Sequence, residues 1–108
     1  MILIKIKNEE FKFEKIYKAL WIYEELTGKQ SSELISTNTF TSQVVFQYCI
    51  LKANNENFNY SLDEYLTLID EERKNNNDVF SILFNYLIQT TIAENKLLEK
   101  EEKKKKVK

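Results

Sequence analysis

The chain has 108 residues, of which 43% are hydrophobic and 31% are charged, and its formal net charge at pH 7 is −1. This length predicts one domain, and no run of apolar residues reaches the roughly 18 that a membrane helix needs. The chain has no histidine, one cysteine and one glycine, which argues against a catalytic histidine, a zinc site and a phosphate-binding glycine loop. We therefore expect a non-enzymatic intracellular protein without metal or cofactor.

The first predicted element is a β-hairpin. Residues 2–7 read Ile-Leu-Ile-Lys-Ile-Lys, Asn8-Glu9 offers a two-residue turn, and residues 11–14 alternate again as Phe-Lys-Phe-Glu. The alternation predicts a buried face made of Ile4, Ile6, Phe11 and Phe13. A two-stranded hairpin is not stable alone, so it must lie on helices or on the sheet of a partner.

An amphipathic helix is predicted over residues 15–27, with Gly28 placed to end it in the left-handed conformation. Tyr17 and Trp21 are four residues apart and therefore neighbours beside the apolar stripe. Two interpretations stay open for them: a wide buried face, or an exposed aromatic patch for a protein partner, because Trp and Tyr dominate binding hot spots. The stripe itself consists of Ile16, Ala19, Leu20, Tyr23 and Leu26.

A polar loop over residues 30–38 precedes a second predicted helix over about residues 39–53. Cys49 lies in an apolar part of that helix and is expected to be a buried, unreactive thiol. Ser61 and Glu64 form a capping box that begins a third helix, which ends near Arg73. The acidic clusters Glu24-Glu25 and Asp70-Glu71-Glu72 are interpreted as solvated faces. The apolar members of the second helix include Phe40, Val44, Phe46, Tyr48, Ile50 and Leu51.

The last predicted helix, over about residues 79–98, is apolar on more than one face, which is typical of a central core helix or of an interface in an oligomer. Residues 99–108 carry six lysines and three glutamates, a net charge of +3, which leaves −4 for the rest. We expect a globular domain over residues 1–98 and a disordered lysine-rich tail over residues 99–108. The acidic body makes nucleic acid an unlikely main partner. The predicted fold class is α+β, mostly α, with an N-terminal hairpin followed by about four helices.

Two N-terminal runs carry a family resemblance. Residues 6–13 read Ile-Lys-Asn-Glu-Glu-Phe-Lys-Phe, and residues 18–29 read Lys-Ala-Leu-Trp-Ile-Tyr-Glu-Glu-Leu-Thr-Gly-Lys. They resemble the tail assembly chaperones of long-tailed bacteriophages and prophages, in which a short hairpin leads into a helix that reads roughly R-A-L-x-x-Y-E-x-x-T-G-K. Residues 58–65 and the long last helix also fit, so the resemblance spans about residues 2–98. The chain departs from the family pattern in having no glycine in the hairpin turn and Lys18 where arginine is usual.

The resemblance implies a non-catalytic protein of the bacterial host cytoplasm. Such chaperones coat the tape measure protein, keep it soluble and recruit tail tube subunits, and many also exist in a longer form made by programmed frameshifting. The lysine run at residues 103–106 suits that arrangement. Our candidate contact residues, chosen on physical grounds, are Tyr17, Trp21, Tyr86 and Ile88.

Other functions and states stay open. The chain is alternatively a structural virion component, such as a head–tail connector subunit, or a small nucleic-acid-binding regulator that only the lysine tail favours. A homo-oligomer also stays open, because the helix over residues 79–98 is apolar on several sides.

Overall fold

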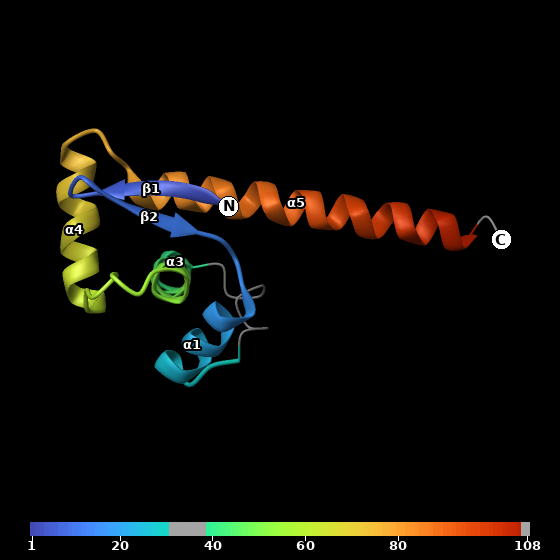
Figure 1. Cartoon of the computed structure of the whole chain (residues 1–108). Coiled ribbons are helices and arrows are strands. Elements are labelled where there is room, and N and C mark those ends of the chain that lie inside the picture. Colours follow the sequence, from blue (N-terminus) through green and yellow to red (C-terminus); the bar gives the residue numbers. More distant parts are fainter. Residues whose placement is uncertain (31–38, 107–108) are drawn as a thin grey trace.

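The computed structural model of this protein describes residues 1–30 and 39–106. Its architecture is mostly helical α+β, as the sequence predicts: a two-stranded antiparallel hairpin is followed by four described helices (Figure 1). The predicted loop over residues 30–38 lies almost wholly outside the described residues. The elements are β1 (Ile2–Ile6), β2 (Glu9–Phe13), α1 (Tyr17–Thr27), α3 (Phe40–Asn54), α4 (Leu62–Lys74) and α5 (Val79–Lys106).

The hairpin confirms the predicted buried face but shifts the turn by one residue. Ile6 pairs with Glu9, so the two loop residues are Lys7 and Asn8, with φ of 52° and 64°. Positive φ at both central residues is the geometry that matches the twist of a two-residue hairpin. Glu9 therefore belongs to β2 instead of to the turn. The four predicted inward side chains, Ile4, Ile6, Phe11 and Phe13, are all 4% exposed or less.

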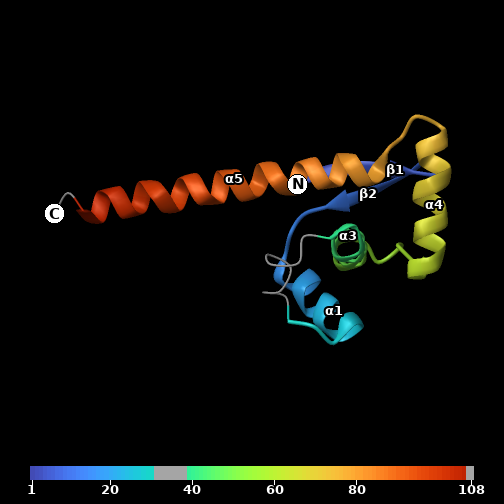
Figure 2. The same cartoon turned by 180° about the vertical axis from the view of Figure 1, so that it is seen from behind.

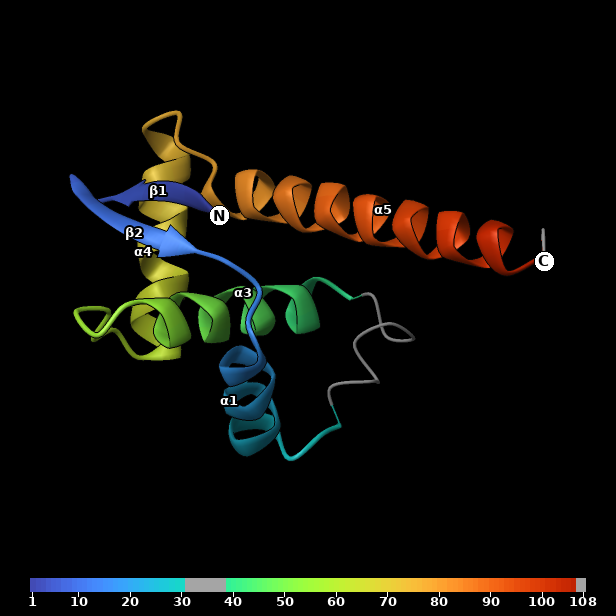
Figure 3. The same cartoon turned by 45° about the vertical axis from the view of Figure 1, so that its right-hand side comes forward.

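The buried face of the hairpin lies over α3 and α4, with the start of α5 alongside (Figures 1 and 3). An aromatic cluster fills the space between them. The Phe58 ring lies 5.3 Å from Phe11, 5.7 Å from Tyr48 and 5.8 Å from Tyr65, measured between ring centroids. These distances are typical of edge-to-face aromatic packing, so the core sits between the hairpin, α3 and α4.

Asparagine side chains at the C-terminal end of α3 hold the outer edge of β2. The Asn55 side chain accepts a hydrogen bond from the backbone N–H of Lys12 at 2.9 Å and donates one to the Lys12 carbonyl at 2.8 Å. One residue earlier, the Asn54 amide donates to the carbonyl of Glu14 at 2.8 Å. Asn55 thus makes with Lys12 both of the bonds that a third strand would make there.

A second set of side-chain bonds holds the turn end of the hairpin. Asn77 donates to the Lys5 carbonyl at 2.8 Å and to Glu72 Oε2 at 3.1 Å. The other carboxylate oxygen of Glu72 accepts the backbone N–H of Lys7. The interpretation of Glu72 as part of a solvated acidic face is therefore wrong: the last turn of α4 places this half-buried side chain against the hairpin turn.

The structure confirms the predicted end of α1 and the predicted start of α4. Gly28 has φ of 69°, and its N–H donates to the Glu24 carbonyl at 2.8 Å, which ends α1. Ser61 and Glu64 form the reciprocal capping box that begins α4. α1 begins at Tyr17, later than predicted, because Ile16 is still extended.

α5 is longer than the sequence analysis predicts. It has 28 residues and continues through Lys106, whereas the expected helix ends near residue 98 and gives way to a disordered tail. Glu and Lys are good helix formers, and neither glycine nor proline interrupts them between residues 94 and 106. The second half of α5 extends beyond the rest of the molecule (Figures 1 and 2). With α5 included, the principal extents of the molecule are 54 × 31 × 25 Å.

Candidate protein-binding surface

The two aromatic side chains singled out on α1 are exposed. Tyr17 is 89% exposed and Trp21 is 64% exposed. The sequence left two interpretations open. The prediction that both side chains belong to a wide buried face is wrong, because both are exposed to solvent. Because Trp and Tyr are the residues that most often dominate binding hot spots, this exposed pair marks a candidate contact surface.

α1 faces outward in this way because a narrow arc of it packs on α3. Ala19 and Tyr23 are buried, and the Tyr23 ring lies 6.1 Å from that of Phe46 in an edge-to-face arrangement. Tyr17 and Trp21 lie on the opposite side of the helix, at positions that turn away from this contact. Leu26, predicted to lie in the packed stripe, is 50% exposed although it shares the side of the helix that holds Ala19 and Tyr23; it lies in the last turn of α1.

The two candidate residues on α5 have different surroundings. Tyr86 is half-buried, with its ring 5.8 Å from that of Phe13, so it helps to join the hairpin to α5. Ile88 is 40% exposed. The four candidates therefore do not form one patch by themselves: Tyr17 and Trp21 are neighbours on α1, whereas Ile88 faces solvent on another helix and Tyr86 contributes to packing.

The structure adds an apolar ridge, of which only Ile88 is among the residues predicted from the sequence. Phe40, the first residue of α3, is 62% exposed, and its ring lies 4.7 Å from that of Phe80. Phe80 in turn stacks with Phe84 at 5.8 Å. Ile88 and Ile92, 40% and 43% exposed, continue the same line along α5 at intervals of four residues. The four-residue spacing from Phe80 to Ile92 is visible in the sequence, but its exposure depends on which side of α5 meets the hairpin.

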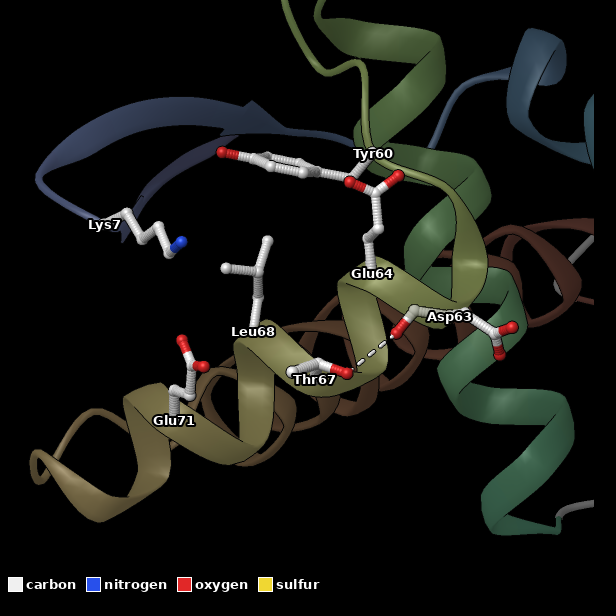
Figure 4. Close-up of a pocket in the computed structure, with 7 residues that line it drawn as sticks. All are labelled: Lys7, Tyr60, Asp63, Glu64, Thr67, Leu68 and Glu71. Atoms are coloured by element: carbon white, nitrogen blue, oxygen red, sulfur yellow. Dashed lines mark hydrogen bonds between the residues drawn. The ribbon is translucent and has the colours of Figure 1, made fainter.

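A shallow groove of about 330 Å³ lies between the hairpin turn and α4 (Figure 4). Lys7 extends toward it from the hairpin, opposite Tyr60 and the carboxylates of Glu64 and Glu71 (Figure 4). Glu64 is already engaged, since one of its oxygens accepts the N–H of Ser61 at 3.1 Å. The remaining lining residues are Asp63, Thr67 and Leu68. These groups form a polar, open surface and do not assemble a paired acid and base.

Cys49 has the buried environment that the sequence predicts. It is fully buried on α3, and burial raises the pKa of its thiol to about 12. The thiol therefore stays protonated at physiological pH, and a protonated thiol is a poor nucleophile and metal ligand. Within residues 1–30 and 39–106, no group of three or more Cys, Asp or Glu side chains is arranged to hold a metal ion.

None of the described helices combines the length and the apolar character needed to cross a membrane. No family model matches the chain, and no curated protein and no solved structure is significantly similar to it.

Proposed function

We propose that this protein is a tail assembly chaperone of a long-tailed bacteriophage or prophage, acting without catalysis in the bacterial host cytoplasm. In this role it binds the tape measure protein, keeps it soluble and recruits tail tube subunits. The observation that carries the proposal is the exposed pair Tyr17 and Trp21 on α1, of which Trp21 lies within the run over residues 18–29 that resembles this family and Tyr17 directly precedes it.

The local structure of that segment supports the proposal. The family pattern of a short hairpin that leads into a helix ending in Thr-Gly-Lys corresponds here to β1, β2 and α1, with Gly28 in the left-handed conformation at the helix end. The Thr27 hydroxyl donates to the Tyr23 carbonyl at 2.7 Å and accepts the Lys29 N–H at 3.1 Å. The residues of the motif thus build the end of the helix that presents the aromatic pair.

The chemistry of the surface suits a helical client. A long amphipathic helix presents an apolar stripe, and aromatic side chains bind such stripes with large contact area and little loss of conformational entropy. Two rings exposed on one helix face offer a contact of limited size, so binding stays reversible. Reversible binding is what a chaperone needs, because its client must later be released into the assembled tail.

Co-expression with a tape measure protein from the same genome tests the proposal. We expect the two proteins to copurify and the tape measure protein to move from the insoluble to the soluble fraction. Trp21→Ser combined with Tyr17→Ser should weaken binding by about 10- to 100-fold, the usual loss when aromatic hot-spot side chains are removed. Leu3→Ser is the matched control, because Leu3 is 55% exposed but lies on the hairpin.

Two outcomes would reject the proposal. The first is a tape measure protein whose solubility and recovery do not change with this chain present. The second is the finding that purified phage particles contain the chain in stoichiometric amounts. That result would favour a structural virion component such as a head–tail connector subunit.

A further inference from the structure

The charged side chains of α1 follow the order opposite to the one that stabilises a helix by itself. Lys18 lies in the first turn, and Glu24 and Glu25 lie in the last turn. A helix dipole is positive at the N-terminal end and negative at the C-terminal end, so each of these charges is repelled by the nearer end of its own helix. α4 has the favourable order, with acidic residues in its first turn and basic residues in its last turn. The stability of α1 alone therefore does not explain its charge order.

The same charges flank the exposed indole on the outer face of α1. This helix lies at the edge of the molecule, with α3 on its inner side (Figure 3). At about 100° per residue, Lys18 is about 60° from Trp21 around the helix axis, and Glu25 is about 40° from it on the same side. Both charged side chains are exposed, and among the described residues neither takes part in an ion pair. The outer face thus has an aromatic centre between a cation and an anion.

We infer that a second copy of this chain covers this face, with the two α1 helices antiparallel about a two-fold axis at Trp21. The inference does not rest on the proposed chaperone function. Because both contacts use Trp21, a second copy and a client protein exclude each other from this face. The mass of the isolated chain and its copurification with a tape measure protein are separate measurements, so either proposal can fail alone.

The proposed two-fold axis brings opposite charges together. The axis reverses positions along the helix about Trp21 and keeps the side on which each residue lies. At 1.5 Å per residue, Lys18 is about 4.5 Å from the axis along the helix, and the partner's Glu25 is about 6 Å from it in the same direction. The ammonium and carboxylate groups therefore face each other twice in the pair. On the other side of the indoles, Tyr17 faces the partner's Glu24, and a phenol donates readily to a carboxylate.

The helix dipoles select the antiparallel orientation. In this pair, Lys18 lies beside the C-terminal half of the partner helix, and Glu25 lies beside its N-terminal half. Charges that oppose the dipole of their own helix thus match the dipole of the partner helix. A parallel pair would place each lysine beside a lysine and each glutamate beside a glutamate, where like charges repel. The outer face of α1 is therefore complementary to itself, as an isologous contact requires.

The mass of the full chain and the fluorescence of its one tryptophan test the pair together. Contact through one helix face is small, so association should be weak. We expect sedimentation equilibrium to approach twice the single-chain mass of 12.9 kDa at about 1 mM, and the single-chain mass at about 5 μM. Trp21 is the one tryptophan of the chain, so its emission maximum should move to longer wavelength over the same dilution. A single-chain mass at about 1 mM overturns the inference, as does a doubled mass without this change in emission.

Two charge reversals test the proposed pairing of side chains. Lys18→Glu and Glu25→Lys each bring like charges together and should raise the dissociation constant at least about 10-fold. In an equimolar mixture of these variants opposite charges face each other again, so the mixture should associate at least about 10-fold more tightly than either variant alone. Glu56→Lys makes the same charge change at an exposed residue between α3 and α4, and should leave the dissociation constant unchanged. Equal weakening by this control, or a mixture that associates no better than its components, overturns the inference.

Discussion

The hairpin and α1 are joined by three residues and both pack on α3, but side-chain hydrogen bonds to the backbone are described for the hairpin in addition to its apolar packing. Directional hydrogen bonds attach the backbone of the hairpin to the rest of the molecule: the Asn54 and Asn77 amides donate to its carbonyls, and Asn55 and Glu72 accept from its N–H groups. α1 is positioned by apolar packing against α3, through Ala19 and the Tyr23 ring. Hydrogen bonds specify one register and one orientation, whereas apolar packing is non-directional. Side chains from the ends of α3 and α4 and from the segments that follow them thus fix the position of the hairpin backbone.

Removing a core side chain of the hairpin should lower the stability of the protein more than any other change considered for these two elements. Phe11→Ala should lower the free energy of unfolding by about 3–5 kcal/mol, the usual cost of a Phe→Ala cavity, because Phe11 is 1% exposed and packs on Phe58. Trp21→Ala on α1 should change it by no more than about 0.5 kcal/mol, because the indole is exposed. Urea denaturation followed by circular dichroism measures both. A large loss for Trp21→Ala would show that the indole packs in the folded protein.

Removing one hydrogen-bonding side chain should have a smaller effect. Asn55→Ala leaves the N–H and carbonyl of Lys12 without their side-chain partner and should cost about 1–3 kcal/mol. Faster hydrogen exchange at the Lys12 amide, measured by NMR, should accompany the loss. Asn59→Ala is the matched control, since Asn59 is exposed in the same connecting segment. Equal losses from the two variants would mean that the Asn55 bonds do not hold the strand.

The smallest effect is expected from Glu72, and it depends on pH. Hydrogen bonds from the Lys7 backbone and from Asn77 hold the pKa of this carboxyl below its ordinary value of 4.5. Its contribution to stability is therefore complete above about pH 4.5 and is lost as the pH falls through the lower pKa of the folded state. Glu72→Gln should cost less than about 1 kcal/mol at pH 7, since the carboxylate is partly exposed.

The difference in unfolding free energy between Glu72→Gln and the natural protein should shrink between pH 5 and pH 3. Urea titrations at four or five pH values measure this difference. A difference that stays constant over this range would show that the ionised carboxylate is not what holds the hairpin turn.

Much of the secondary structure can be predicted from local sequence patterns, because the interactions that begin and end helices and strands involve residues only a few positions apart. Alternation predicts the buried face of the hairpin, Ser61 and Glu64 predict the start of α4, and Gly28 predicts the end of α1. The left-handed conformation of Lys7 is not predictable in this way, because lysine has no preference for positive φ. Only the tertiary fold decides that the last turn of α4 places Glu72 against the hairpin turn.

The candidate surface is harder to predict from the sequence, because the exposure of its side chains depends on tertiary packing. A helical repeat shows that Tyr17 and Trp21 share a face, but which arc of α1 meets α3 is a property of packing. Phe40 likewise falls in an apolar stretch, and its exposure follows from its place at the first turn of α3. The charge-free stretch at residues 79–93 is visible in the sequence, yet only the structure separates its buried side from its open side.

The Asn55 contact with Lys12 also bears on how this protein behaves at high concentration. An unpaired strand edge is a template on which another chain can add a strand, and runaway addition produces fibrils. By bonding both free backbone groups of Lys12, the Asn55 amide closes the middle of the β2 edge with a side chain that cannot itself be extended. The hairpin contains the hydrophobic strand β1, Ile-Leu-Ile-Lys-Ile. The Asn55 contact thereby keeps the β2 edge of this hairpin from pairing with a strand of another chain.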